Sequence, residues 1–406
     1  MSRSRSGRDQ MAQAMRIVIA GAGLGGLYAA AALARIGAEV VVVERAEALS
    51  EVGAGIQVSP NGSRLLARID ALTEVERDAF QPEAAEMRLG VSGATILHLP
   101  LGATAEARWG APYLQVHRAD LLSALARAAQ AAGAEIRLDA PVAGVESGSD
   151  GARLRLENGE TLEADLLIGA DGVRSTVRDS LFGAVAPRFT GQTAWRGVVA
   201  ADALPPGLVH PTATVWVGQG RHLVTYYLRR GALVNFVAVV ERPEWVEEDW
   251  RARGDLEALR AAFAGWAPGA AKVIEAATEC WLWGLFDRPP PPSWRKGCAA
   301  LLGDACHPML PFMAQGATQA FEDGAALAAA LAREPDVDRA LAAYETRRRG
   351  RAARVQAVAR DNARLFHARG PAERLARYGP IFLGARAAPA FAMSRLDWLY
   401  GHDAAA

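Results

Sequence analysis

The stretch Arg16-Ile17-Val18-Ile19-Ala20-Gly21-Ala22-Gly23-Leu24-Gly25-Gly26 decides the fold of this chain. Its first five residues predict a short buried strand, and the Ala- and Leu-rich run over 27–36 predicts a helix. The glycines between them have the spacing Gly-x-Gly-x-x-Gly. The order of strand, tight turn and helix is that of a dinucleotide-binding unit.

Each glycine of this turn meets a different physical need. Gly21 permits the tight turn, Gly23 lets the backbone approach a pyrophosphate, and Gly26 lets the helix lie close to the sheet. The phosphates would then meet the positive N-terminus of the helix. Leu24 and Gly25 complete the part of the turn that we assign to cofactor binding.

An acidic residue follows at the distance that this motif requires. A second strand is predicted over 39–43, and it ends at Glu44, about 20 residues beyond the glycines, where a carboxylate hydrogen-bonds a ribose 2′-OH. We therefore expect an adenosine with a free 2′-OH, as in FAD or NAD. Glu44 and the adjacent Arg45 are assigned to the cofactor site.

The composition is that of a globular enzyme whose partners are small molecules. The chain has 406 residues, enough for two domains, and 51% of them are hydrophobic without a long uninterrupted apolar run. Its 45 basic and 45 acidic residues give a formal net charge of zero. This balance argues against binding to nucleic acid and against a polybasic membrane anchor.

Cysteine usage and the N-terminus bear on location. Cys280, Cys298 and Cys306 are odd in number and lack the spacing of metal ligands. We therefore expect no metal site and no disulfide framework, and we infer a cytoplasmic protein. The polar leader 1–14 lacks the apolar stretch of a secretory signal. It is interpreted as a frayed tail, or as a segment upstream of the true start, which the sequence leaves open.

Beyond the glycine turn, the alternation of strands and helices continues and then changes character. The next predicted elements are a helix opening at 117–122, strands at 135–138, 152–157 and 162–170, and a helix start at Ser175. Short alternating strands then predict a separate β-sheet layer. They are expected at 193–199, 213–217, 222–229 and 233–240.

The chain then returns to the first domain. Residues 298–303 predict another apolar strand after the stiff run Pro289–Pro292, and 317–331 and 337–365 predict closing helices. The sequence therefore predicts an α/β fold. We expect a Rossmann-like nucleotide-binding domain to be interleaved with the β-sheet layer and followed by C-terminal helices.

Two further motifs carry a family resemblance. They are Gly169-Ala170-Asp171-Gly172 and Gly303-Asp304-Ala305-Cys306-His307-Pro308. With the glycine turn, in this order, they resemble the single-component FAD-dependent aromatic hydroxylases, especially the salicylate hydroxylase-like and the hydroxybenzoate and hydroxynicotinate hydroxylases. The resemblance covers nearly all of the chain. It implies an FAD-binding part over 15–184, a mainly β substrate domain over 185–285, a return to the FAD-binding domain over 286–370 and a C-terminal segment over 371–406.

The resemblance implies that FAD is the cofactor and gives roles to single residues. The glycine turn would hold the pyrophosphate, Glu44 the adenosine ribose, and Arg118 the chain of the flavin. Asp171 would serve both FAD and the nicotinamide donor. For Arg118, the alternative is a surface charge pair with Asp120. For Asp171-Gly172, the alternative is an ordinary turn.

The remaining cofactor residues lie near the end of the chain. By the same resemblance, Gly303 and Asp304 would hold the ribityl or pyrophosphate region, and Gly316 and Ala317 would bring backbone close to the isoalloxazine ring. His307 belongs to this motif, and we assign it a structural role.

His222 and Tyr226 are the predicted catalytic pair. They stand four residues apart on a predicted strand, so both side chains lie on one face and point into one cavity. A phenol hydroxylase needs a group that removes the proton of the substrate hydroxyl, and a histidine with a pKa near 6.5 suits this task. Tyr226 can relay or position. A matching pair occurs in hydroxybenzoate and hydroxynicotinate members, while packed sheet residues are the alternative.

Gln57, Trp195 and Pro311 are assigned to substrate binding. Gln57 stands where hydroxynicotinate hydroxylases carry His, and Pro311 stands where hydroxybenzoate 6-hydroxylases carry a polar residue. Both differences favour a salicylate-like activity. Trp195, with Arg196 and Trp216, is a candidate for the pocket wall, although Trp on strands is more often part of the core.

The reaction implied by the resemblance is a hydroxylation. NADH or NADPH visits transiently and reduces FAD, O2 adds to form a C4a-hydroperoxide, and a small phenolic or heteroaromatic carboxylic acid takes the distal oxygen. The alternatives are a hydroxylase or epoxidase of a larger natural product, and a flavin reductase without oxygen transfer. The aromatic ring, the loss of CO2, the choice of NADH or NADPH, and a monomer or homodimer are left open.

Overall fold

The glycine turn follows an inner strand of a six-stranded sheet, in the order β17-β18-β11-β1-β2-β7. The computed structural model describes residues 15–49, 54–242 and 252–406, so the leader 1–14 lies outside the described residues. The strands are β1 (Arg16–Ala20), β2 (Glu39–Val43), β7 (Glu135–Arg137), β11 (Leu166–Gly169), β17 (Arg295–Lys296) and β18 (Ala299–Leu301). All pairs are parallel except the edge strand β17. The last four residues of β1 are all buried, as expected for a parallel strand covered on both faces.

Helices cover this sheet as the sequence predicts. The helix α1 (Leu24–Ala34) begins directly after the turn and contacts both α5 (Arg118–Ala131) and α9 (Gly316–Arg333). The smaller elements around them are α2 (Pro60–Arg68), α3 (Leu72–Asp78), α4 (Ala103–Trp109), α6 (Thr176–Phe182), and the two-stranded pair β3 (Gly55–Val58) and β6 (Leu114–His117). The predicted Rossmann-like α/β fold is therefore confirmed.

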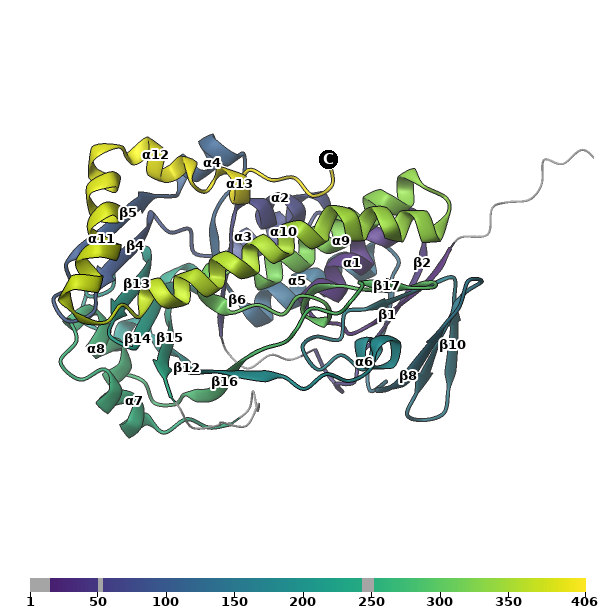
Figure 1. Ribbon diagram of the computed structural model, residues 1–406, viewed down its shortest axis with the longest axis horizontal. Helices are drawn as coiled ribbons and strands as arrows, with labels where there is room; N and C mark the ends of the chain where they lie inside the picture. Colours follow the sequence, from purple (N-terminus) through teal and green to yellow (C-terminus); the bar gives the residue numbers. More distant parts are fainter. Residues whose placement is uncertain (1–14, 50–53, 243–251) are drawn as a thin grey trace, which may run out of the picture.

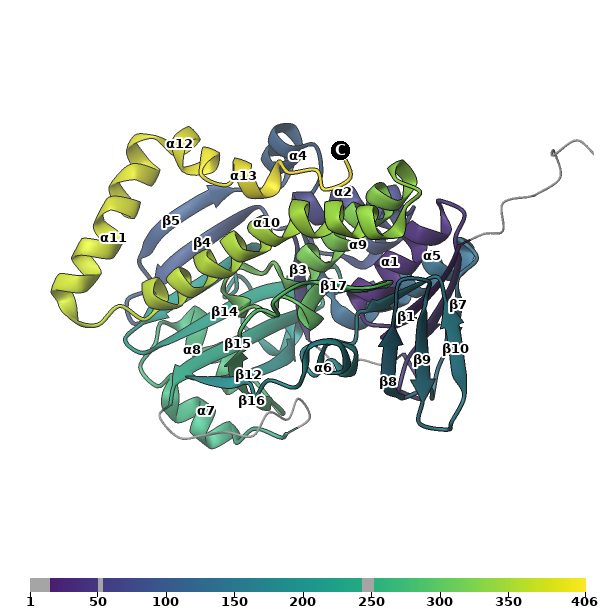
Figure 2. The same ribbon diagram turned by 45° about the vertical axis from the view of Figure 1, so that its right-hand side comes forward.

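The expected single strand over 162–170 is wrong. The chain forms β10 (Thr161–Ala164), interrupts at Asp165, and then forms β11 in a different sheet. Asp165 Oδ2 accepts a hydrogen bond from Arg16 N at 2.7 Å, which fixes the break beside β1. The strands β8 (Val142–Ser147), β9 (Ala152–Leu156) and β10 form an antiparallel three-stranded sheet, visible at the right of Figure 2.

A seven-stranded sheet forms the other half of the molecule, in the order β16-β12-β15-β14-β13-β4-β5. Its strands are β4 (Ala84–Leu89), β5 (Thr95–Pro100), β12 (Arg188–Ala200), β13 (Thr212–Gly218), β14 (Arg221–Leu228), β15 (Leu233–Glu241) and β16 (Trp281–Asp287). The four central strands match the predicted β layer. The segment 84–100, which the sequence places in the FAD-binding part, joins this sheet because β4 pairs in parallel with β13. The helices α7 (Leu256–Ala262) and α8 (Pro268–Glu275) lie below the sheet in Figure 1.

One long helix connects the two halves. Figure 1 shows α10 (Val337–Phe366) crossing the front of the molecule from the parallel sheet to the seven-stranded sheet. The chain ends in α11 (Gly370–Ala387), α12 (Pro389–Ser394) and α13 (Asp397–Tyr400). α11 and α12 lie along the side of β5, and α13 contacts α2 (Figure 2). Among the described residues, no helix combines the length and apolar character needed to cross a bilayer.

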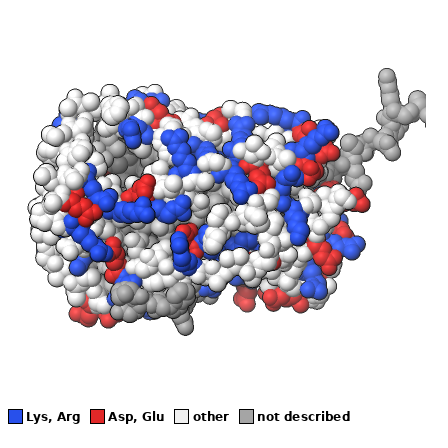
Figure 3. All heavy atoms as spheres, viewed as in Figure 1, with Lys and Arg blue, Asp and Glu red and all other residues white. Residues whose placement is uncertain are grey.

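The surface carries mixed charge. In Figure 3 many basic side chains lie over the Arg-rich helix α10, with acidic side chains between them. This face therefore has no broad area of one sign, in keeping with the formal net charge of zero.

A buried ion network ties α9 to α10. Arg348, which is 0% exposed, donates to Glu322 Oε2 at 2.5 Å and to Asp323 Oδ1 at 2.7 Å, and Arg351 also donates to Glu322. Burial alone would raise the pKa of both carboxyls, but the paired cations outweigh burial and lower it. The network therefore stabilises the fold at neutral pH, and this stabilisation is lost as the pH falls through the range below the ordinary carboxyl pKa.

Replacing Arg348 by Met should strongly destabilise the protein, because buried Asp323 loses its guanidinium partner and buried Glu322 is left with Arg351. We expect the free energy of unfolding to fall by about 3–5 kcal/mol in chemical denaturation. Arg364→Met is the control, since Arg364 pairs with Asp361 at the surface of the same helix. Equal losses in the two variants would contradict this account.

Candidate functional site

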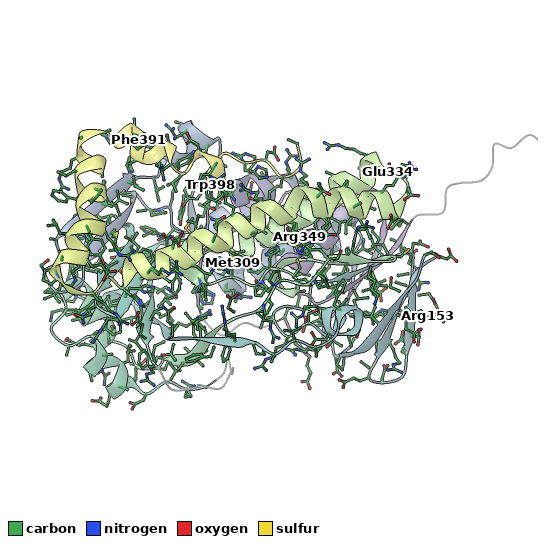
Figure 4. All side chains as sticks on the ribbon, viewed as in Figure 1. Arg153, Met309, Glu334, Arg349, Phe391 and Trp398 are labelled. Atoms are coloured by element: carbon green, nitrogen blue, oxygen red, sulfur yellow. The ribbon has the colours of Figure 1, made fainter. Side chains whose placement is uncertain are left out.

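A cavity of about 570 Å³ lies between the glycine turn and the seven-stranded sheet. Gly23, Leu24 and Gly25 line one end, and side chains of β12, β14 and β15 line the other. The segment 309–317 covers the space between them. Figure 4 shows Met309 of this segment beside α10. The cavity therefore joins the predicted cofactor site to the predicted catalytic strand.

The glycines of the turn fall into two groups. Gly21 has φ +103°, and a Cβ at this position would lie 2.5 Å from the carbonyl oxygen of Ala170. A Cβ on Gly26 would lie 2.0 Å from the Gly21 oxygen. At Gly23 no described atom outside its chain neighbours lies within 4 Å of such a Cβ. Gly21 and Gly26 are thus needed for packing, whereas Gly23 keeps open the space in front of the helix N-terminus.

Glu44 braces this turn from the end of β2. Its carboxylate accepts hydrogen bonds from Ala22 N at 2.8 Å and from Ala46 N at 3.0 Å. Each carboxylate oxygen has a further lone pair, so the geometry allows the predicted ribose contact as well. Arg45 follows as an exposed residue. The cofactor contacts of both residues stay predictions.

Asp171 is engaged by the backbone and side chains of its own segment. It accepts hydrogen bonds from Ser175 Oγ at 2.5 Å and from Val177 N at 3.0 Å, while Ser175 caps α6 as predicted. Burial raises the pKa of its carboxyl, against the opposing effect of these hydrogen bonds. Its neighbours Ala170 and Gly172 line the cavity. The role of Asp171 toward FAD and the nicotinamide donor stays a prediction.

Two opposite charges line the cavity near the turn. Arg118 opens α5, whereas Asp120 is held by Arg229 through both carboxylate oxygens at 2.8 and 2.9 Å. Asp304 stands in the turn after β18. Asp304 is exposed toward the cavity, where desolvation by the surrounding protein raises the pKa of its carboxyl and the Arg118 guanidinium opposes this shift. Arg118 and Asp304 therefore line the same cavity, and their charges interact.

Asp323 of α9 anchors the turn that carries Asp304. Asp323 Oδ2 accepts from Gly303 N at 2.9 Å and lies 2.5 Å from His307 Nε2. Cys306, His307 and Asp323 have donor atoms within 4.8 Å of one another, as a metal site would. Asp323, however, is already paired with Arg348. The cluster therefore serves to hold the turn, in agreement with the structural role expected for His307.

The catalytic candidates lie together on one face of the seven-stranded sheet. His222, Val224 and Tyr226 of β14 all line the cavity, as the period of two predicts. Burial and the neighbouring His367 hold the pKa of His222 well below its ordinary value. Burial raises the pKa of Tyr226, so this residue keeps its hydroxyl proton at neutral pH. The pair thus provides a neutral imidazole and a hydrogen-bond donor in one apolar space.

The expectation that Trp195 lines the pocket is wrong. Trp195 is 1% exposed and packs with Phe236 and Val199 in the core on the other face of the sheet. Successive strand residues point to opposite faces, so the neighbouring Arg196 lines the cavity instead. The Arg196 guanidinium lies 3.9 Å from the centroid of the Trp283 ring. Arg196 stands opposite Val237 of β15, and Val237 stands opposite Val224 of β14, so these three residues share the cavity face. This pairing register, which the sequence did not give, separates Arg196 from Trp195.

Gly55 makes room for Tyr226, a constraint that the sequence did not reveal. A Cβ on Gly55 would lie 2.5 Å from Cε2 of the tyrosine ring. Gly55 N also donates to Asn235 Oδ1 at 2.7 Å. The strand β3 is therefore fixed against the cavity face of the seven-stranded sheet, although the two segments are far apart in the sequence.

The other predicted substrate residues do line the cavity. Gln57 accepts a hydrogen bond from the Tyr113 hydroxyl at 2.7 Å, and Pro311 lies in the short helix η4 (Pro311–Met313). Asn362 of α10 donates to Phe312 O at 3.0 Å and so holds this covering segment. Gly316 and Ala317 also line the cavity, at the start of α9. Their contacts with substrate and cofactor stay predictions.

Comparison with known proteins shows which family and which enzymes this chain is similar to. The family described as FAD binding domain matches residues 14–359. A 3-amino-4-hydroxybenzoate 2-monooxygenase of Streptomyces platensis is 40% identical over 395 residues, which are 96% of each chain. A 6-hydroxynicotinate 3-monooxygenase of Bordetella bronchiseptica is 39% identical over 354 residues, covering 86% of this chain and 92% of its own. The structure of a salicylate hydroxylase substrate complex has a TM-score of 0.81 and 25% identity, with 96% of each chain covered.

Alanine at Gly23 should impair FAD binding, whereas alanine at Gly26 should impair stability. Gly23→Ala adds a methyl group to open space at φ −72°, so the protein should fold normally but lose bound FAD. Gly26→Ala should lower the free energy of unfolding by about 1–3 kcal/mol, because the methyl group meets backbone. Thermal unfolding and flavin absorbance after gel filtration separate the two. Normal FAD retention in Gly23→Ala would contradict this assignment.

Proposed function

This chain belongs to the FAD binding domain family as an FAD-dependent aromatic hydroxylase, and we propose that it uses NAD(P)H and O2 to hydroxylate a small phenolic carboxylic acid. One observation supports this choice of substrate. The apolar cavity face of the sheet carries an imidazole, a phenol hydroxyl and a guanidinium, from His222, Tyr226 and Arg196. These groups suit a ring that bears a hydroxyl and an anionic substituent.

The residues of the cavity fit FAD. The open space at Gly23 and the N-terminus of α1 would hold the pyrophosphate, where the helix favours negative charge. Arg118 and Asp304 would bind the chain of the flavin, and the backbone at Gly316 and Ala317 would lie along its ring. Bound FAD would supply the redox chemistry by accepting electrons from NAD(P)H and activating O2.

Arg196 is the group that would recognise the carboxylate. Arginine matches a carboxylate with two parallel hydrogen bonds, and these are stronger in a space from which water is excluded. The walls around it are largely aliphatic, including Val224, Val237 and Val239. An anionic ring would therefore bind with its carboxylate toward β12 and its remaining edge over β15 and β14.

His222 would act on the substrate hydroxyl. As a neutral imidazole it can accept the phenol proton, and the resulting phenolate donates electron density to the ring carbons. Tyr226 would donate a hydrogen bond that orients the oxygen. The covering segment 309–317 would keep water from the reacting atoms. Each of these tasks needs only a side chain that already lines the cavity.

Aerobic NAD(P)H oxidation by the FAD-loaded protein tests the function. We expect salicylate, 3- or 4-hydroxybenzoate, 3-amino-4-hydroxybenzoate or 6-hydroxynicotinate to stimulate oxidation with little peroxide release and with formation of hydroxylated product. No stimulation by any of these acids would favour a larger substrate, and oxidation independent of O2 would favour a reductase.

Replacing His222 by Ala should lower hydroxylation by roughly 10²-fold or more, because the phenol loses its proton acceptor. The control is His98→Ala, since His98 is an exposed histidine of β5. Quantified product per NAD(P)H oxidised is the measurement. Unchanged turnover and coupling in the His222 variant would remove the assignment.

Replacing Arg196 by Met should raise KM for a carboxylated substrate by about 10–100-fold, with a smaller effect on the corresponding uncharged phenol, because the lost contact is a charge-assisted hydrogen bond. Arg253→Met is a matched control, since Arg253 also stacks on a tryptophan of β16, with Cζ 5.1 Å from the Trp281 centroid. Equal losses for the acid and the uncharged phenol would contradict carboxylate recognition.

A further inference from the structure

A second histidine lies directly behind His222. His222 Nδ1 is 2.7 Å from His367 Nε2, and both side chains are buried. The other ring nitrogen of His367, Nδ1, is 3.1 Å from Glu241 Oε1. The second carboxylate oxygen of Glu241 accepts from Arg369. A continuous chain of hydrogen-bonding groups thus begins at the cavity and leaves it on the side away from the substrate.

Exposure to solvent increases along this series of hydrogen-bonding groups. The exposed fraction of the side chain is 2% for His367, 32% for Glu241 and 68% for Arg369. The groups come from the start of β14, the end of β15 and the residues that follow α10. Figure 1 shows the C-terminal end of α10 meeting these strands. Only the fold brings them together, since His222 and His367 are 145 residues apart.

The carboxylate determines which ring nitrogens carry protons. Ionised Glu241 can only accept, so neutral His367 must carry its proton on Nδ1. Its Nε2 is then an acceptor, and neutral His222 must donate to it from Nδ1. The lone pair of His222 is therefore on Nε2. This is the nitrogen left to receive a proton from a substrate in the cavity.

The apolar surroundings of His222 destabilise its protonated, positively charged form. The rings of Phe312 and Phe366 each lie 5.1 Å from the imidazole, centroid to centroid. Such apolar surroundings disfavour the imidazolium, and burial lowers the pKa of both histidines. Glu241 opposes that shift at His367. A proton taken up by His222 is consequently more stable after it has moved toward His367 and Glu241.

We propose that His367 and Glu241 form a proton relay that holds Nε2 of His222 ready for the substrate hydroxyl and carries the proton to the surface. This rests on the proposed function of His222. The phenol proton bonds to His222 Nε2, the Nδ1 proton of His222 passes to His367 Nε2, and the Nδ1 proton of His367 passes to Glu241 and water. One proton leaves and no electrons move. On product release the same steps in reverse protonate the product and restore each ring.

Charged groups lie at both ends of the relay in the part of the chain that the structure describes. Glu241 and Arg369 lie at the outer end, and Tyr226 and Arg196 line the same cavity as His222. Glu241 is the one anion among them, and its pKa is lowered because Arg369 and His367 outweigh burial. Glu241 is thus ionised at neutral pH, as the relay requires.

The tautomers can be observed without substrate or turnover. Nitrogen-15 NMR of the FAD-loaded protein, labelled in its seven histidines, distinguishes protonated from unprotonated ring nitrogens. The signals are assigned with His222→Asn and His367→Phe. We expect His222 to carry its proton on Nδ1 in the wild type and on Nε2 in His367→Phe. A proton on Nε2 in the wild type, or the same tautomer in both proteins, would overturn the proposal.

The relay step is tested by Glu241→Gln. Glutamine can still accept from His367, so the His222 tautomer should persist, but the amide cannot take up a proton. We expect kcat with the best acid of the substrate panel to fall about 10-fold, with KM changed less than 2-fold and a larger solvent isotope effect. Glu373→Gln is the control, because Glu373 accepts from Arg369 N and does not contact the histidines.

The results separate the relay from the proposed function and from a structural role. Equal kcat in Glu241→Gln and Glu373→Gln would overturn the relay while leaving His222 as the base. A parallel loss of FAD and thermal stability in Glu241→Gln, with an unchanged isotope effect, would make Glu241 structural and also overturn it. No hydroxylation by the wild type with any substrate would remove the proposed function, while the NMR result would still decide the tautomer.

Discussion

The cavity depends on the buried cation of Arg348 and the two carboxylates that it holds. Through Asp323 it fixes the backbone of Gly303, and thus the turn that carries Asp304. Through Glu322 it reaches the amide of Asn61, at the start of α2. A buried charge is tolerated only when its partners satisfy it, so these segments cannot shift independently. The ion network accordingly holds both the turn that carries Asp304 and the start of α2.

The end of the cavity that carries the proposed catalytic residues follows from a simpler rule, the alternation of side chains along a strand. One face of β12, β14 and β15 turns to the cavity and the other to a core that includes Trp195. A single step in register therefore exchanges an indole for the guanidinium of Arg196. The same rule places His222 and Tyr226 together, four residues apart. The sheet thus provides a largely apolar floor with three polar groups at defined positions.

An apolar floor solves one chemical problem and creates another. It keeps water from the reacting atoms, and it makes a positive charge on His222 unfavourable. If His222 is the base, as we propose, it works there only when the proton can move on to another group. His367 and Glu241, from two other parts of the chain, would provide this route at 2.7 and 3.1 Å. In this proposal, burial of His222 and its connection to the surface belong to one arrangement.

The sequence by itself determined the features that depend on neighbours along the chain. Local periodicity and backbone sterics account for four such features. They are the strand Arg16–Ala20, the turn glycines, the capping Ser175, and the shared face of His222 and Tyr226. A resemblance across three motifs extended this to the family. Only the tertiary structure decided the break at Asp165, because that break depends on pairing with β1.

Contacts between distant segments were likewise beyond the sequence. The place of residues 84–100 in the seven-stranded sheet depends on the pairing of β4 with β13, and the fit of Gly55 against Tyr226 depends on where β3 docks. The approach of His367 to His222 depends on where a long helix ends. Local patterns specify which face a side chain takes, whereas the partner that it meets there is set by packing of the whole chain.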